Sequence, residues 1–109
     1  MFIRNLAQSA VFRPDKMGKS DVASGELLFA GLNAFEPGQE HKLHAHAGQD
    51  KFYLILEGSG EVTVGEETQT LSAGDAAFAA DGVPHSVHNT GSGRLVILAI
   101  LGPPPARKS

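Results

Sequence analysis

Cysteine and tryptophan are absent from this chain of 109 residues, and tyrosine occurs once. Without cysteine there are no disulfides and no thiolate metal sites, so any metal must be held by nitrogen and oxygen atoms. The chain also lacks a run of about 18 apolar residues, so we expect no membrane partner. Its net charge of -3 does not favour a nucleic-acid partner, which requires a clustered basic face.

The chain is long enough for one domain, which would bury roughly 65% of the surface exposed by the unfolded form. The first twelve residues are too polar for a signal-peptide core and the lack of cysteine fits the cytosol, so we expect a cytoplasmic protein. We divide the chain into an irregular segment (1–25), a barrel (26–101) and a disordered tail (102–109). Edge or exchanged strands are expected at 2–3 and 10–12.

Glycine is frequent, with 13 of 109 residues, or about 12% against an average near 7%. Short apolar runs bounded by glycine-containing turns predict strands rather than helices. No segment between residues 40 and 101 is long enough for a crossover helix, so we predict antiparallel sheets in an all-β protein. The expected strands are 26–35, 41–46, 52–57, 61–64, 68–71, 76–80, 85–88 and 95–101.

Three of the five histidines lie at positions that suggest a metal site. His44 and His46 are two residues apart, so on a strand both imidazoles would point to one face. His85 follows the turn at 81–84 and would supply a third ligand from another strand. The competing interpretation is that all three are ordinary surface or loop histidines.

Two motifs resemble those of the cupin family. Residues 38–58 resemble the first cupin motif, G-x5-H-x-H-x(3,4)-E-x6-G, with Gly38, His44, His46 and Gly58 in place. Residues 74–89 resemble the second, G-x5-P-x-G-x2-H-x3-N, in which only the proline is replaced, by Ala80. The fifteen residues between the motifs match the short spacer of small bacterial cupins. The chain is therefore identified as resembling a small single-domain cupin, whose barrel would span residues 26–101.

This resemblance implies an antiparallel jelly-roll barrel with both motifs facing one interior. It also implies a divalent metal ion, bound in the family by two histidines and a glutamate of the first motif and a histidine of the second. His44, His46 and His85 carry over directly, but the glutamate does not. Its place is taken by Lys51, or by Asp50 in the shorter form of the motif.

Three interpretations of this missing glutamate remain open. Gln49 would supply the fourth ligand if the strand extends to it, and we prefer this set of His44, His46, Gln49 and His85, around Zn, Fe, Mn or Ni. Asp50 would do so if the turn shifts the register by one residue. Alternatively, Lys51 points inward, metal binding is weak or absent, and the ammonium is neutralised, turned away or paired with a substrate anion.

Other residues carry weaker signals. Lys51 and Tyr53 share a strand face and are the candidate catalytic residues; the phenol would act as an acid or hydrogen-bond donor, unless it merely packs. By strand alternation, His41 and His88 should point away from the metal face, to the surface or an interface. Phe35, Phe52 and Phe78 are expected in the core, and Asn89 is expected to hold a turn.

Two function classes follow from the resemblance. The first is a metal-dependent enzyme of dioxygenase, isomerase, decarboxylase or lyase type, acting on a small oxygenated or carboxylated substrate inside the barrel. The second is a non-catalytic module that binds or senses a small ligand with weak metal binding or none. Whether the protein is an enzyme stays open at this point. The resemblance further implies a homodimer, formed through the apolar segments at 2–3 and 10–12.

Overall fold

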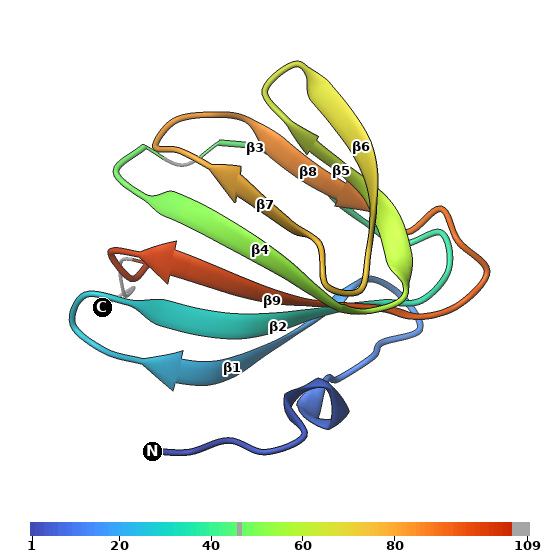
Figure 1. The fold of residues 1–109 in the computed structure, drawn as a ribbon, viewed down its shortest axis with the longest axis horizontal. Coiled ribbons are helices and arrows are strands. Elements are labelled where there is room, and N and C mark those ends of the chain that lie inside the picture. The colour runs from blue at the N-terminus through green and yellow to red at the C-terminus, as the bar shows by residue number, and fades with distance from the viewer. Residues whose placement is uncertain (46, 106–109) are drawn as a thin grey trace.

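The computed structural model describes residues 1–45 and 47–105. The described part holds one short 3-10 helix and nine strands (Figure 1). These are η1 (Leu6–Ser9), β1 (Gly18–Ser24), β2 (Phe29–Phe35), β3 (Glu40–His44), β4 (Asp50–Glu57), β5 (Ser59–Val64), β6 (Glu67–Ser72), β7 (Ala76–Ala79), β8 (His85–His88) and β9 (Leu95–Gly102).

The strands form two antiparallel sheets that pack against each other. One sheet has five strands in the order β1-β2-β9-β4-β7, and the other has four in the order β3-β8-β5-β6. Strands distant in the sequence lie side by side, as β2 does with β9 (Figure 1). The predicted all-β jelly-roll fold is therefore confirmed.

The eight strands predicted between residues 26 and 101 correspond to β2–β9. The N-terminal segment differs from the prediction. In the structure, residues 2–3 and 10–12 form no strand, whereas residues 18–24 form β1. This strand is rich in polar residues and has one β-branched apolar residue, so its sequence gives little β signal; pairing with the edge of β2 makes it a strand.

The core lies between the sheets and is built from the inward-facing residues of each strand. On β4, Tyr53 and Ile55 are fully buried, and Phe35 of β2 is buried as predicted. Burying side chains of this size contributes about 1.5–3 kcal/mol each. The core cluster comprises Met17, Phe35, Tyr53, Ile55, Val62, Val87, Leu95, Ile97, Ala99 and Leu101.

The prediction that Phe52 and Phe78 belong to this core is wrong. They pair with each other across β4 and β7, and their side chains are 39% and 54% exposed. Because neighbouring residues of a strand alternate between faces, the burial of Tyr53 turns Phe52 outward. The outer face of the five-stranded sheet is thus apolar at these positions.

The turns of both motifs have the expected local structure. Gly38, Gly58, Gly74 and Gly82 all have positive φ angles. At Gly58 a β-carbon would also collide with the backbone carbonyl of Arg94, so this position requires glycine for two reasons. Asn89 holds a turn, as predicted: its amide donates to Phe35 O at 3.1 Å and to Gly93 O at 2.9 Å.

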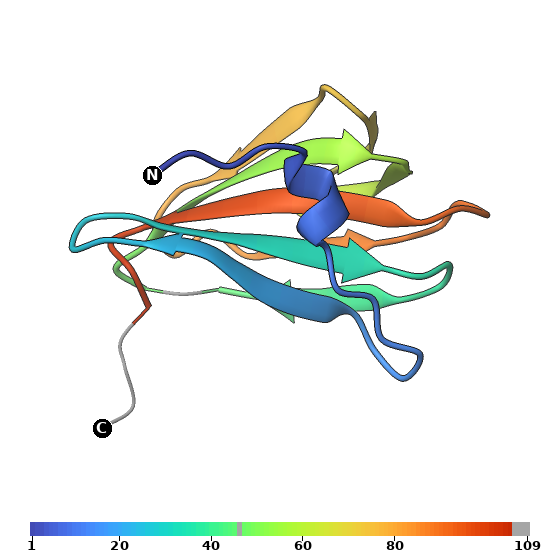
Figure 2. The same cartoon turned by 90° about the horizontal axis from the view of Figure 1, so that it is seen from below.

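The N-terminal segment lies on the outer side of the five-stranded sheet. In Figure 2, η1 crosses in front of β2 and β9, and in Figure 1 it lies below β1. The Arg94 guanidinium is 4.2 Å from the Phe12 ring centroid and forms an ion pair with Glu36 at 2.9 Å. Beyond this anchor, Phe2 is 99% exposed. In the described residues no helix is long and apolar enough to cross a membrane.

Candidate functional site

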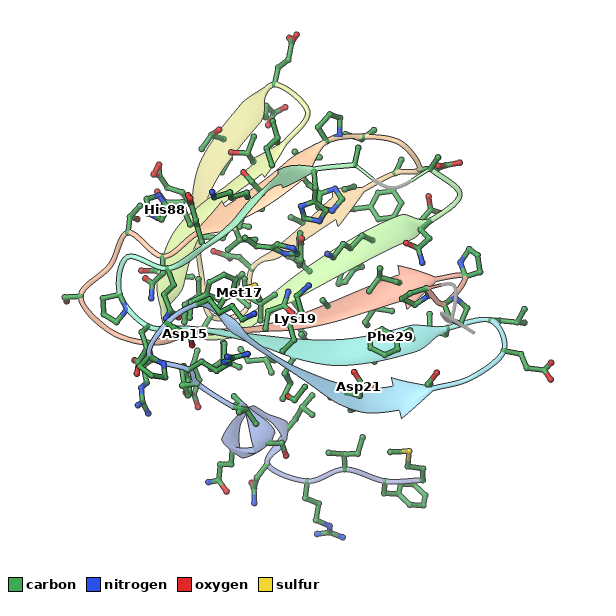
Figure 3. The ribbon with its side chains drawn as sticks, turned by 180° about the vertical axis from the view of Figure 1, so that it is seen from behind. Asp15, Met17, Lys19, Asp21, Phe29 and His88 are labelled. Atoms are coloured by element: carbon green, nitrogen blue, oxygen red, sulfur yellow. The ribbon has the colours of Figure 1, made fainter. Side chains whose placement is uncertain are left out.

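A cleft of about 790 Å³ opens at one end of the five-stranded sheet. Residues of β1, β2, β9 and β4 line it on the inner face of that sheet, and His41 of β3 lines it from the other sheet. Lys19 and Asp21 of β1 and Phe29 of β2 are among its lining residues and are labelled in Figure 3. Residues 103–105 close one side, so the described part of the predicted tail contributes to the cleft, while residues 106–109 lie outside the described residues.

Three imidazoles gather beside this cleft. The ring centroids of His41 and His44 are 4.1 Å apart, and those of His44 and His85 are 4.2 Å apart. Nδ1 of His44 lies 2.6 Å from Lys42 O, and Nδ1 of His85 lies 2.9 Å from Val83 O. Because a carbonyl oxygen only accepts, each Nδ1 donates, and in the neutral ring the lone pair is then on Nε2.

The expectation that His41 points away from His44 is wrong. His41 pairs with Val87 and His44 pairs with His85. Between these two pairs the chain advances by three residues along β3 but by only two along β8. This β-bulge inserts one residue and thereby brings two histidines three residues apart to the same side. Burial, followed by the charges of His44 and nearby lysines, lowers the pKa of His41 to about 3. His88 is exposed, as predicted.

Lys51 points inward, as the third interpretation of the missing glutamate required. Its side chain is 6% exposed and lines the cleft, and its Nζ lies 5.0 Å from the Tyr53 ring centroid. Within the described part of the chain, no carboxylate forms an ion pair with it. Burial and, to a lesser degree, the charge of Lys19 lower the pKa of Lys51 to about 8. The Lys51 ammonium is thus a buried cation that lacks a counterion among the described residues.

Gln49 and Asp50 each form a hydrogen bond with another segment of the chain. Gln49 lines the cleft, and its amide Nε2 donates to Pro103 O at 2.9 Å. Asp50 is exposed and its Oδ1 accepts from Asp81 N at 2.9 Å, away from the cleft-lining residues. Gln49 is therefore the one of these two that faces the cleft, while Asp50 ties its loop to the 81–84 turn.

Tyr53 lies beneath the cleft rather than in its lining. It is 0% exposed, and its ring centroid is 6.0 Å from that of His85. Among the described residues its hydroxyl has no hydrogen-bond partner. Burial raises the pKa of Tyr53 above its usual value, so the phenol stays protonated. The alternation of side chains along the strand predicted the correct face for Tyr53. The phenol is less accessible to a ligand than this prediction implied.

The described residues alone do not make up a metal site. They include no group of three or more histidine, aspartate or glutamate side chains that could hold one. His46, which the predicted ligand set requires, lies outside the described residues. The ammonium of Lys51, where the family motif has glutamate, repels a cation. The set of His44, His46, Gln49 and His85 therefore stays a prediction.

Sequence reasoning missed two residues of this site. His41 was assigned to the opposite face, and only the bulge in β3 corrects this. Lys19 was not considered, because β1 itself was not predicted. The β1–β2 register places Lys19 opposite Asn33, and Asn33 also lines the cleft. The signal in the sequence that could have revealed Lys19 is the two-residue spacing of Lys19 and Asp21, which would place both on one face of a strand with little intrinsic β preference.

Comparison with known proteins agrees with this architecture. A family model described as "Cupin domain" matches residues 31–101. The oxalate-binding protein of Thermotoga maritima is 36% identical over 85 residues, which cover 78% of this chain and 69% of that protein. The chain belongs to the cupin family.

Solved structures share the fold. A protein of Thermus thermophilus with a known crystal structure is 42% identical to this chain. The match covers 96% of this chain and 100% of the other, with a TM-score of 0.91. A predicted oxalate decarboxylase from Thermotoga maritima is 27% identical, with a TM-score of 0.75 over 79% of each chain.

Proposed function

We propose that this protein binds a small carboxylate ligand in the cleft, with the Lys51 ammonium as the anchor for the anion. The observation that carries this proposal is the burial of Lys51 without a carboxylate partner among the described residues. A buried charge is costly unless it is paired, and a ligand carboxylate would pair it. Lys19 lies within electrostatic reach of Lys51 and makes the surroundings still more favourable to an anion.

The name of one relative supports the same chemistry. The protein of Thermotoga maritima that shares 36% identity is an oxalate-binding protein, and oxalate is a carboxylate. The proposal for this chain rests on Lys51 and uses the relative only as support for the ligand class.

Calorimetric titration of the chelator-treated protein with acetate and with oxalate tests the proposal. We expect binding of at least one of these anions, weakened at least tenfold by Lys51→Met. The matched control is Lys16→Gln, which removes an exposed cation outside the cleft lining and should leave the affinity unchanged. Absence of binding at millimolar anion, or binding that Lys51→Met leaves intact, would overturn the proposal.

A metal-dependent reaction is the second candidate function. The observation that favours it is the pair of histidines, His44 and His85, whose Nδ1 atoms are held by backbone carbonyls, an arrangement typical of metal-binding histidines. His46 and Gln49 would complete the ligand set, and the metal would supply Lewis acidity to an oxygenated substrate. In such a reaction Lys51 would hold the substrate anion, while Tyr53, which is buried beneath the cleft, would support Lys51 and His85 from below.

Metal analysis of protein purified without a tag or chelator separates the two candidates. A near-stoichiometric divalent ion that is lost in His44→Ala supports the second. Only trace metal in well-folded protein contradicts it and leaves the carboxylate proposal untouched. Gln49→Ala then shows whether the amide is a ligand, since metal content should fall only if it is.

We also propose that the protein forms a homodimer, through the outer face of the five-stranded sheet rather than through added N-terminal strands. The outward residues of β4 face apolar partners on β9 and β7: Phe52 pairs with Ile100 and Phe78, and Leu54 pairs with Leu98. A solvated antiparallel sheet normally carries polar residues on its outer face. A second copy offers the same apolar face, so two-fold pairing matches the two surfaces without burying a charge.

A further inference from the structure

Asn33 of β2 is a buried polar residue that points into the cleft. Its side chain is 6% exposed, and it lines the cleft. Because side chains alternate along a strand, it points to the same side as Phe35, which belongs to the core between the sheets. Its paired neighbours are Ile97 of β9, which is fully buried in that core, and Lys19 of β1. Asn33 therefore lies where the apolar core ends and the polar cleft begins.

The carboxamide of Asn33 forms no side-chain hydrogen bond among the described residues. By contrast, the carboxamide of Asn89, which is also buried, donates to two carbonyls and accepts from Gly91 N at 3.1 Å. A buried amide without a partner is less favourable than an apolar residue of similar shape. Contacts within the described part of the chain therefore do not account for an asparagine beside Ile97.

The polar groups near Asn33 are of mixed kind. Lys19 lies opposite it and only donates, whereas Asp21, on the same face of β1, only accepts (Figure 3). From the other sheet, His41 lines the cleft, and its buried Nδ1 has no hydrogen-bond partner among the described residues. A hydroxyl both donates and accepts, as a carboxamide does, so it suits this set. A second carboxylate only accepts and would be repelled by Asp21, and an alkyl group would leave the amide unpaired.

Asn33 lies well apart from the anchor at Lys51. Their paired partners on β9, which lies between β2 and β4, are Ile97 and Leu101. This register corresponds to roughly 16 Å between the backbones of Asn33 and Lys51, from four residues of strand and two inter-strand spacings. The lysine side chain spans part of this separation, since its Nζ lies beside the ring of Tyr53, the next inward residue of β4. A ligand that contacts both groups therefore needs a chain of several carbons.

We infer that the ligand is a hydroxylated carboxylic acid of several carbons, whose carboxylate binds Lys51 and whose hydroxyl groups bind the carboxamide of Asn33. The inference rests on the proposed function and specifies its ligand class. Asn33 is then the residue that selects a hydroxylated acid over an alkyl acid or a dicarboxylate of the same length. A site that hydrogen-bonds a hydroxyl rejects an analogue lacking it, because the buried polar group of the site stays unpaired.

Calorimetry on the full, chelator-treated chain compares three six-carbon acids: gluconate, which carries hydroxyls, hexanoate, which carries none, and adipate, which has a second carboxylate. We expect gluconate to bind at least tenfold more tightly than either of the others. Asn33→Leu should reduce this preference at least fivefold without lowering the affinity for hexanoate. Asn33→Ala is the second variant, with the same expected result, in case leucine disturbs the core. Gln69→Leu removes an exposed carboxamide from β6, outside the cleft lining, and is the control.

The outcomes separate this inference from the proposal on which it rests. If acetate or oxalate binds in a Lys51-dependent manner but gluconate has no advantage over hexanoate or adipate, the inference is wrong and the proposed function stands. If none of the five acids binds, or if Lys51→Met changes none of the affinities, both are wrong. A preference for gluconate that survives both Asn33 variants, or an equal loss of gluconate and hexanoate affinity, would also overturn the inference.

Discussion

At the scale of single residues, Lys51 combines a cost in stability with a role in binding. The lowering of its pKa to about 8 means that the charged form is poorly accommodated in the ligand-free protein at neutral pH. Lys51→Met keeps much of the side-chain volume and removes the charge. We expect its free energy of unfolding, measured by urea denaturation at pH 7, to rise by on the order of 2 kcal/mol.

The same variant should lose the anion affinity described above, so stability and binding should change in opposite directions. A marked decrease in stability would mean that the ammonium is satisfied in the native protein. In that case Lys51 would be a structural residue rather than an anchor for a ligand.

Tyr53 allows a pH experiment with a single reporter, because the chain has one tyrosine and no tryptophan. Its pKa is raised by burial above the usual value near 10. A raised pKa in the folded state means that this contribution to stability is intact below pH 10 and is lost as the pH rises further. We expect tyrosinate absorbance in the near ultraviolet to appear only together with unfolding detected by circular dichroism.

Tyr53→Phe is the companion variant. It removes a hydroxyl without a hydrogen-bond partner among the described residues, so it should be neutral or stabilising at pH 7 and less sensitive to alkaline pH. Titration of the phenol near pH 10 in folded protein would show that it is accessible to solvent, contrary to the structure.

How well the sequence predicts the direction of these side chains depends on how regularly side chains alternate along each strand. Alternation along β4 correctly placed Lys51 and Tyr53 on one face, because this strand pairs with regular register over both positions. Alternation failed at His41, because the bulge adds a residue before His44. Alternation could not decide whether Lys51 points inward or whether the turn shifts the register so that Asp50 does. The register depends on the hydrogen bonds of Gln49 and Asp50 to other segments, which the local sequence does not show.

At the scale of elements, the turns that join the strands differ in how strictly they need glycine. Gly38 and Gly58 both have positive φ, but a β-carbon at Gly38 would meet nothing within 4 Å, whereas one at Gly58 would collide with Arg94. Gly38→Ala should cost about 1–2 kcal/mol from backbone strain alone. Gly58→Ala should cost clearly more. Thermal denaturation of both variants tests this difference, which equal losses would contradict.

Element prediction was good where turn residues bound short apolar runs, as for β4 and β9, and poor in the first 25 residues. Val11 and Phe12 look like a strand in sequence, but they form none: Val11 is exposed, and the Phe12 ring stacks on the Arg94 guanidinium. β1, by contrast, has little intrinsic preference and forms because the edge of β2 offers it backbone partners. Such tertiary effects are not visible in local sequence.

At the scale of the whole molecule, the proposed dimer makes a prediction about mass. Light scattering at tens of micromolar should give the mass of two chains for the native protein. Phe52→Lys places an ammonium from each copy in the apolar interface and should shift the mass toward one chain. Leu43→Lys changes an exposed apolar position on β3, in the other sheet, and should leave the mass unchanged. A native protein of single-chain mass would contradict the proposal.

The bulge in β3 also has a consequence for which changes of backbone the imidazole cluster tolerates. Loss of one residue between His41 and His44 would remove the bulge and leave the two histidines two residues apart on a regular strand, where alternation keeps both rings on one face. A strand of the present length without the bulge would instead turn His41 outward while every histidine is retained. Shortening this stretch by one residue should therefore preserve the cluster that straightening it would break.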